Sequence, residues 1–223
     1  VSGITASDKT YDGSTSATMD GTSAVYSGLV SGDTLTGTYS GVFDNANVGT
    51  GKTVTITSSY GGTDVNNYTI TDQASTTADI SAKALTATAS VSNKTYDATN
   101  TATATLTLSG LVGSETLSTT NTSTFNNKNV GTDKTVTVNS ITLADGTGLA
   151  ANYSISPGQT TTADITAKSL TVSGITASNK TYDATTTATL NTGSVTYTGL
   201  VSGDDFNGTY TCLLYTSDAA DDP

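Results

Sequence analysis

The stretch Lys9-Thr10-Tyr11-Asp12-Gly13 decides how the chain is organised, because it returns twice. It recurs as Lys94-Thr95-Tyr96-Asp97-Ala98 and as Lys180-Thr181-Tyr182-Asp183-Ala184, at spacings of 85 and 86 residues. A period of this length is too long for one rung of a solenoid, and it suits a small domain that folds by itself. The sequence therefore predicts independently folding units joined head to tail.

Other landmarks recur in the same order. They are Gly28-Leu29-Val30 with Gly110-Leu111-Val112 and Gly199-Leu200-Val201, Asn47-Val48-Gly49-Thr50 with Asn129-Val130-Gly131-Thr132, Asn67-Tyr68 with Asn152-Tyr153, and Ala78-Asp79-Ile80 with Ala163-Asp164-Ile165. A shared order of several landmarks indicates repetition rather than chance. We predict a first repeat over residues 1–84, a second over 85–169, and a truncated third over 170–211.

Strand patterns fill each repeat. Polar and apolar residues alternate in Lys52–Thr57, Tyr68–Thr71, Thr103–Leu108 and Lys134–Asn139. A period of two places the apolar side chains on one face of a strand and threonine on the other. No stretch shows a sustained apolar period of 3.6 residues. The fold class predicted is all-β with little or no helix, as small antiparallel, immunoglobulin-like β-sandwiches arranged end to end.

The first joint between repeats can be located by strand parity. Ala78, Ile80 and Ala82 share one face of a strand, whereas Leu85 and Ala87 have the opposite parity. Because a slip of one residue reverses the buried face, we expect one core to end and another to begin near Ala84. The same test places the second joint near Ser169. The connections contain neither proline nor a Gly/Ser run, which indicates stiff joints rather than flexible linkers.

Composition excludes several classes of function. The chain has 223 residues, a net charge of −11, eight basic residues, no His, no Trp and one Cys. It therefore lacks the residues for a Cys/His zinc site, a Ser-His-Asp triad or a Cys-His pair. The acidic balance argues against nucleic acid as a partner. The absence of Trp and the regular copying of the same acids argue against a glycosidase cleft, so we expect no enzymatic activity and no catalytic residue.

The repeated tyrosine–aspartate pair is the strongest local signal. Its members are Tyr11, Asp12, Tyr96, Asp97, Tyr182 and Asp183. In a functional interpretation the rings are platforms for a ligand. In a structural one each ring is buried with its hydroxyl bonded to backbone, and each aspartate caps a turn by accepting backbone N–H groups. We favour the structural interpretation. The exchange of Gly13 for alanine at the two later copies predicts a negative φ there.

Calcium is an alternative that the sequence leaves open. Acids recur as Asp12/Asp97/Asp183, as Asp79/Asp164 and as Asp33/Glu115/Asp204, and calcium takes several oxygen ligands. No D-x-D-x-D-G loop is present, so the local sequence signal for calcium is weak, and ligands contributed across a joint are left open. We predict no other cofactor.

The combination of Lys-Thr-Tyr-Asp-Gly, Gly-Leu-Val-x-Gly-Asp, Asn-Val-Gly-Thr, Asn-Tyr-x-Ile and Ala-Asp-Ile-x-Ala-Lys resembles the YDG/MBG-type repeats. These occur in large bacterial surface proteins, including filamentous-haemagglutinin-like adhesins. The resemblance covers Val1 to about Thr211. It implies tandem all-β repeats of a secreted or surface-attached adhesin, located outside the cell or at its surface, and it supplies no catalytic residues.

Two functions follow as hypotheses. The first is a structural stalk or spacer whose partners are the neighbouring repeats of the same chain, without membrane insertion by this part. The alternative is a module that binds host or environmental glycans or surface proteins through exposed tyrosines, with avidity from repetition. Tyr26 corresponds to Tyr197, but the second repeat has Leu108 at that place. Rings that bind a ligand should recur more faithfully, so we favour the spacer.

The last twelve residues break the composition. Residues 212–223 contain the single Cys and three of the nineteen acids. They resemble the translation of a sequencing-library adapter, so we expect this tail to be non-native and the native part to end near Thr211.

Overall fold

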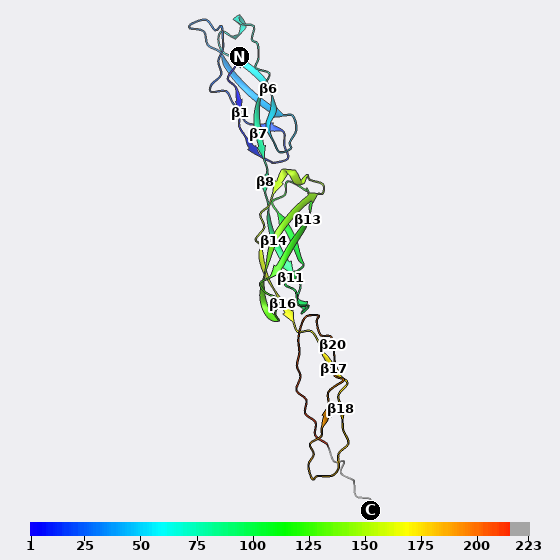
Figure 1. The fold of residues 1–223 in the computed structure, drawn as a ribbon. Coiled ribbons are helices and arrows are strands. Elements are labelled where there is room, and N and C mark those ends of the chain that lie inside the picture. The colour runs from blue at the N-terminus through cyan, green and yellow to red at the C-terminus, as the bar shows by residue number, and fades with distance from the viewer. Residues whose placement is uncertain (215–223) are drawn as a thin grey trace, which may run out of the picture. The chain divides into compact units, whose positions relative to one another are not determined.

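The computed structural model describes residues 1–214 and shows a chain of β-strands (Figure 1). Helical structure in these residues is limited to two single 3-10 turns, η1 (Val65–Asn67) and η2 (Ala150–Asn152). The prediction of an all-β fold with almost no helix is confirmed. None of the helical segments described is long and apolar enough to cross a membrane.

The first repeat is built on one five-stranded sheet. Its strands are β1 (Thr5–Ala6), β2 (Lys9–Thr10), β3 (Ser16–Ala17), β4 (Met19–Asp20), β5 (Thr36–Phe43), β6 (Gly49–Gly61) and β7 (Ser75–Ser81). The order in the sheet is β2-β7-β6-β5-β3, and β1 pairs separately with β4. The long strand β6 lies in the middle, antiparallel to β5 from Thr36↔Gly61 to Phe43↔Val54.

The second repeat has the same sheet order. Its strands are β9 (Thr86–Val91), β10 (Lys94–Thr95), β11 (Thr101–Ala102), β12 (Ala104–Ser109), β13 (Leu117–Phe125), β14 (Gly131–Asp145), β15 (Tyr153–Ser154) and β16 (Thr160–Thr166), and β8 (Lys83–Ala84) precedes them at the predicted boundary. The order β10-β16-β14-β13-β11 corresponds strand by strand to that of the first repeat. The sequence period is therefore also a period of topology.

The third repeat contains shorter ladders. They are formed by β17 (Thr171–Ser173) with β20 (Thr196–Thr198) and by β18 (Thr176–Ala177) with β19 (Leu190–Asn191), both antiparallel. Of the tail that we expect to be adapter-derived, Leu213 forms a bridge with Thr187. Residues 215–223 of that tail lie outside the described part of the chain.

Burial follows the predicted alternation. In β6 the side chains of Val54 and Ile56 are buried between exposed threonines. One of the predicted strands is wrong, because Tyr68–Thr71 is not in a strand. The corresponding residues of the second repeat form β15, which pairs with β8.

The expectation of antiparallel pairing does not hold for every pair of strands. Strand β2 pairs parallel to β7, β10 pairs parallel to β16, and β8 pairs parallel to β15. A parallel pair requires a long connection between its strands. Here almost a whole repeat separates β2 from β7, so the first short strand of each repeat can return alongside its last one.

Contacts divide the chain into two units. The first consists of residues 1–90, 103–123 and 137–161, and the second of residues 91–102, 124–136 and the chain from 162 onward. These limits run through the second repeat, and the repeat boundaries near residues 84 and 169 stay predictions.

Each unit has a buried core. The first is formed by Tyr11, Phe43, Val54, Ala78, Ile80, Leu85 and Tyr153, and the second by Ala102, Phe125, Val136, Ala163 and Ile165. The buried parity does change between Ile80 and Leu85. Even so, the expectation that one core ends near Ala84 is wrong, because Leu85 and Tyr153 share a cluster with Tyr11.

The residue after each Tyr-Asp pair has a left-handed backbone. Its φ is 78° at Gly13, 64° at Ala98 and 61° at Ala184. The prediction of a negative φ from the glycine-to-alanine exchange is therefore wrong. Alanine in this region costs about 1–2 kcal/mol, so other contacts must hold the loop in this conformation.

Replacing Ala98 by glycine should relieve that strain. We expect the free energy of unfolding to rise by about 0.5 kcal/mol, because the relief exceeds the extra freedom that glycine gives the unfolded chain. Thermal unfolding followed by circular dichroism measures the change. Ala104→Gly, at a buried strand position, is the matched control and should lower stability. A loss of stability in Ala98→Gly would contradict the prediction.

Candidate functional site

Each Lys-Thr-Tyr-Asp loop is folded by its own lysine and aspartate. Lys9 Nζ lies 2.7 Å from Asp12 Oδ1 and donates to the carbonyl oxygens of Ser14 and Ser16 at 2.9 and 3.2 Å. The Asp12 carboxylate accepts the backbone N–H of Ser14 at 2.8 Å, which is the turn-capping arrangement expected from the sequence. These bonds are all local, so the loop can form without help from a neighbouring repeat.

The same bonds recur in the other two loops. The Lys94–Asp97 and Lys180–Asp183 distances are both 2.7 Å, and each aspartate accepts a backbone N–H two residues on. The hydrogen bond from the lysine is the main cause that lowers the pKa of Asp97 and of Asp183 to about 2. Sequence reasoning gave roles to the tyrosine and the aspartate but none to the lysine, although the lysine recurs in all three copies.

The tyrosine ring leaves its own loop and reaches the acid of the following repeat. Tyr11 is buried and its Oη donates to Glu115 Oε1 at 2.6 Å, and Tyr96 Oη donates to Asp204 Oδ1 at 3.1 Å. The expectation of a hydroxyl bonded to backbone is therefore wrong. Tyr182 is the exception, because this residue is 90% exposed.

The acid that receives Tyr11 is positioned by a tight turn. The backbone N–H of Glu115 donates to the carbonyl oxygen of Val112 at 3.0 Å. Tyr153 Oη donates to Glu115 Oε2 at 2.5 Å and accepts the N–H of Val112 at 3.0 Å. The rings of Tyr11 and Tyr153 meet edge to face, with centroids 5.3 Å apart. We call Tyr11, Glu115 and Tyr153 the tyrosine clasp.

A second contact lies beside the clasp in the same unit. Asn152, which is 2% exposed, accepts the N–H of Val48 at 2.9 Å and donates to Asn47 Oδ1 at 3.0 Å. The Asn-Val-Gly and Asn-Tyr landmarks of successive repeats therefore meet. The short β8–β15 ladder adds backbone bonds, including Leu85 N–H to the Ser154 carbonyl oxygen at 2.8 Å.

The clasp favours neutral phenols. The hydrogen bond to Glu115, followed by burial, raises the pKa of Tyr11 to about 12. Burial, followed by the bond to Glu115, also raises the pKa of Tyr153. Two neutral donors thus satisfy the two oxygens of one carboxylate, and no cation is needed at this position.

The acids that left calcium open have protein partners. Glu115 and Asp204 accept tyrosine hydroxyls, Asp79 accepts the N–H of Gly51 at 2.7 Å, and Asp164 accepts the N–H of Asp133 at 2.9 Å. Within residues 1–214 no group of three or more His, Cys, Asp or Glu side chains could hold a metal ion.

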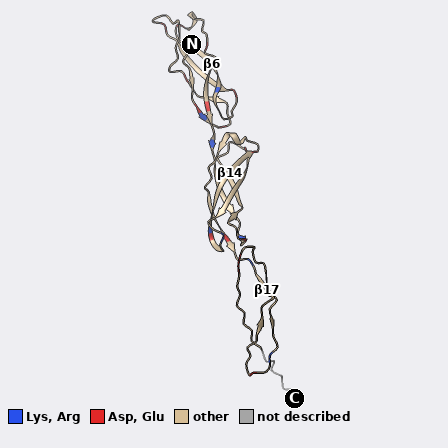
Figure 2. Ribbon diagram, in the orientation of Figure 1, with Lys and Arg blue, Asp and Glu red and all other residues tan. Residues whose placement is uncertain are grey.

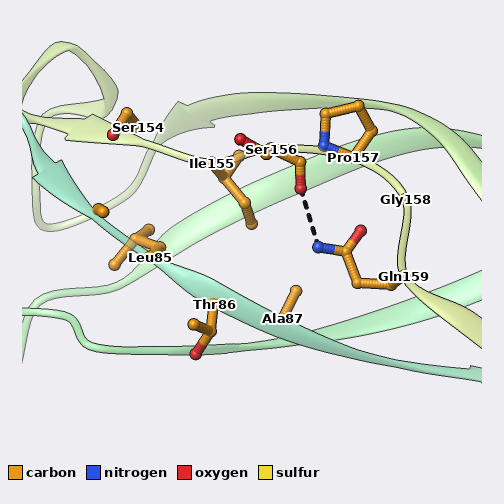
Figure 3. Close-up of a pocket in the computed structure, with 10 residues that line it drawn as sticks. Leu85, Thr86, Ala87, Ser154, Ile155, Ser156, Pro157, Gly158 and Gln159 are labelled. Carbon is orange, nitrogen blue, oxygen red and sulfur yellow. Dashed lines mark hydrogen bonds between the residues drawn. The ribbon is translucent and has the colours of Figure 1, made fainter.

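A pocket of about 470 Å³ lies next to β8 and β15 (Figure 3). Its lining residues are Ala84, Leu85, Thr86, Ala87, Ser154, Ile155, Ser156, Pro157, Gly158 and Gln159. The side-chain amide of Gln159 donates to the Ser156 carbonyl oxygen at 2.8 Å. The lining has no ionisable side chain, so it offers neither a general acid or base nor a charged metal ligand.

Removing one hydroxyl should test the clasp. Tyr11→Phe keeps the buried ring but loses a hydrogen bond to a charged group, so we expect a loss of about 2 kcal/mol. Native-state hydrogen exchange of the Leu85 amide reports it locally, and urea unfolding reports it globally. Tyr182→Phe is the matched control, since that ring is exposed, and it should change neither. Equal effects of the two substitutions would argue against the clasp.

Alkaline pH should also weaken the joint. The pKa of Tyr11 is about 12 when folded, against 10.0 for an unperturbed tyrosine. Because the folded state holds this proton more tightly, its stabilising contribution is complete below pH 10 and is lost as the pH rises through 12. Ultraviolet titration of tyrosinate in the native chain and in Tyr11→Phe should differ by one transition near pH 12. If the titration curves of the two proteins superimpose, the raised pKa does not belong to Tyr11.

Comparison with known proteins gives a family and no individual relative. The family model of the YDG domain matches residues 1–78, 81–163 and 166–222. No curated protein and no solved structure matches the chain significantly. The matched segments cover nearly the whole sequence and each contains one Lys-Thr-Tyr-Asp loop, so the chain belongs to the YDG domain family.

Proposed function

We propose that the chain is a non-catalytic spacer made of tandem, small β-sandwich repeats in a large secreted or surface-attached bacterial adhesin. The observation that carries this proposal is the recurrence of one contact. A tyrosine from the first loop meets Glu115, and a tyrosine from the second loop meets Asp204. Because equivalent side chains connect each repeat to the next, these contacts are suited to fixing the geometry of the joint between repeats.

Burial at the first joint supports a stiff connection. Leu85, Tyr153 and Asn152 of the second repeat are all less than 10% exposed, next to the equally buried Tyr11 of the first. Such packing resists bending, because a hinge would expose apolar surface and leave the Glu115 carboxylate with fewer donors. A flexible linker of glycine and serine would have neither contact.

The surface composition supports an extracellular setting. Charged residues make up only 12% of the chain, and most strands carry none (Figure 2). Exposed threonine alternates with buried apolar residues along β6 and β14, which keeps the surface soluble without many charges. The resemblance to repeats of filamentous-haemagglutinin-like adhesins supplies the bacterial surface as the proposed location.

Glycan binding receives less support. The hydroxyls of Tyr26 and Tyr39 bond to each other at 2.9 Å, and the rings of both meet Tyr60 edge to face. Rings engaged with one another are poor platforms for a sugar. The second repeat has Leu108 in place of Tyr26, so a binding surface of this kind would be missing from it.

Relative motion of the repeats tests the spacer proposal. In the full chain, ¹⁵N relaxation should give one rotational correlation time for residues 1–80 and for residues 104–123 and 137–155. Glu115→Ala removes the acceptor of two tyrosines, so it should let these segments tumble separately. Asp205→Ala, an exposed acid outside the clasp, is the control and should leave the native values unchanged. Independent tumbling in the native chain would refute a stiff spacer.

A further inference from the structure

A lysine on the buried face of β6 lies against a side-chain amide. Lys52 shares this face with Val54 and Ile56, because the three residues alternate along the strand, and its side chain is 9% exposed. Its Nζ donates to Asn45 Oδ1 at 2.9 Å. Asn45 lies in the turn that connects β5 to β6, so these two side chains close the turn.

A glycine holds the stem of the lysine in place. A Cβ atom on Gly49 would lie 3.3 Å from both Cγ and Cδ of Lys52, so the stem passes over a residue that has no side chain. The register between β6 and β7 shifts between these two residues, as it does at a β-bulge. The amine is therefore held beside Asn45 with few alternative rotamers, which lowers the entropy cost of a reaction between the two side chains.

The amide group of Asn45 has the surroundings of an acyl-transfer site. Besides the lysine, Asn45 Oδ1 accepts the backbone N–H of Asn47 at 3.0 Å. A fixed N–H donor of this kind stabilises the negative charge that develops on a carbonyl oxygen when a nucleophile adds to its carbon. A nucleophile and an oxyanion donor thus both lie beside one side-chain amide.

A carboxylate completes the arrangement. Asp44 Oδ1 lies 2.9 Å from Lys52 Nζ. The hydrogen bond from Lys52 is the main cause that lowers the pKa of Asp44, so this carboxylate is ionised and can accept a proton. We call Asp44, Asn45, Asn47 and Lys52 the lysine site.

The second repeat has the same geometry without the carboxylate. Lys134 is 8% exposed and its Nζ donates to Asn127 Oδ1 at 2.7 Å. Asn127 Oδ1 also accepts the backbone N–H of Asn129 at 3.0 Å. The position of Asp44 is occupied by Asn126, whose neutral amide is not a base. The chain therefore contains an equivalent site that lacks one component.

We propose that the lysine site forms an intramolecular isopeptide bond between Lys52 and Asn45. The Lys52 amine, in its neutral form, adds to Asn45 Cγ, and the Asn47 N–H binds the oxygen that becomes negative. Asp44 takes one proton from the attacking nitrogen and gives it to Asn45 Nδ2. The Cγ–Nδ2 bond then breaks, ammonia leaves, and a secondary amide joins Cγ to Nζ. The reaction consumes no oxidant, reductant or other co-reactant.

The bond closes the β5–β6 turn covalently. It forms once in each molecule, so it is a modification of the chain and not a turnover of substrate. The inference concerns chemistry within one repeat and does not depend on the spacer role. A spacer under tension would nevertheless gain from it, because the turn could no longer open at this point.

Mass spectrometry of the full-length chain tests the proposal, because the bond removes one ammonia, about 17 Da. Trypsin does not cleave after an acylated lysine, so digestion should give an uncleaved peptide of residues 10–83 that is lighter by this amount. Its fragment spectrum should join Asn45 to Lys52. Asp44→Asn should slow formation of the bond about a hundredfold, and Lys52→Arg should abolish it. The Asp44 side chain is 50% exposed, so the fold should survive, which circular dichroism verifies.

The second repeat supplies the matched gain-of-function control. In the native chain Asn127 and Lys134 should stay unlinked, whereas Asn126→Asp should add a second loss of about 17 Da and link them. Complete cleavage after Lys52 without a mass loss in the native chain would overturn the proposal. A loss that persists in Lys52→Arg would overturn it as well, because an asparagine would then release ammonia by another route, such as succinimide formation. Equal linkage in both native repeats would overturn the role of Asp44.

Discussion

The hydrogen bond between Tyr11 and Glu115 is the interaction on which the architecture depends. It joins residues 104 positions apart at 2.6 Å, and it belongs to a cluster in which Tyr153 satisfies the other carboxylate oxygen. A carboxylate that is withdrawn from water needs donors. The phenols of Tyr11 and Tyr153 provide these donors and also apolar ring surface. Glu115 therefore both orders its own turn and binds the tyrosine of the preceding repeat.

Lysine and tyrosine have different structural roles in the motif, which explains why both recur. All four ion pairs in the described residues are local: Lys9–Asp12, Lys52–Asp44, Lys94–Asp97 and Lys180–Asp183. Lysine therefore shapes loops, and uncharged hydroxyls make the joints. Exposed ion pairs are weakened by salt, whereas a phenol–carboxylate bond beside packed rings is less so. A protein with few basic residues can thus form repeated joints that need no lysine.

Much of the fold could be predicted from the sequence, and the misses have physical causes. Alternation along Lys52–Thr57 predicted β6 correctly, and the change of parity between Ile80 and Leu85 is real. Parity reports which face of a strand is buried, but not whether two buried faces adjoin, so the shared cluster of Tyr11, Leu85 and Tyr153 could not be anticipated. The parallel β2–β7 pair was missed because strand direction depends on distant partners rather than on local pattern.

The site was predictable in its residues but not in its contacts. Tyr11 and Asp12 were identified through repetition, yet the partner of Tyr11 lies in the next repeat, where Glu115 had been considered as a calcium ligand. Repetition gave a usable signal here: the tyrosine and the acid recur in equal number and in the same order along the chain, as two halves of one contact would.

The left-handed conformation of the two alanines also depends on whether local or distant contacts hold it. Ala98 and Ala184 keep φ near 60° although alanine resists it. Lys94 binds Asp97 and the carbonyl oxygen after Ala98, so it holds the chain on both sides of that alanine. Lys180 does the same around Ala184. Tyr182 is exposed while its loop is fully formed, so the loop conformation cannot depend on docking. The strain is therefore sustained locally, and the loop meets the following repeat already shaped, which lowers the entropy lost when the clasp closes.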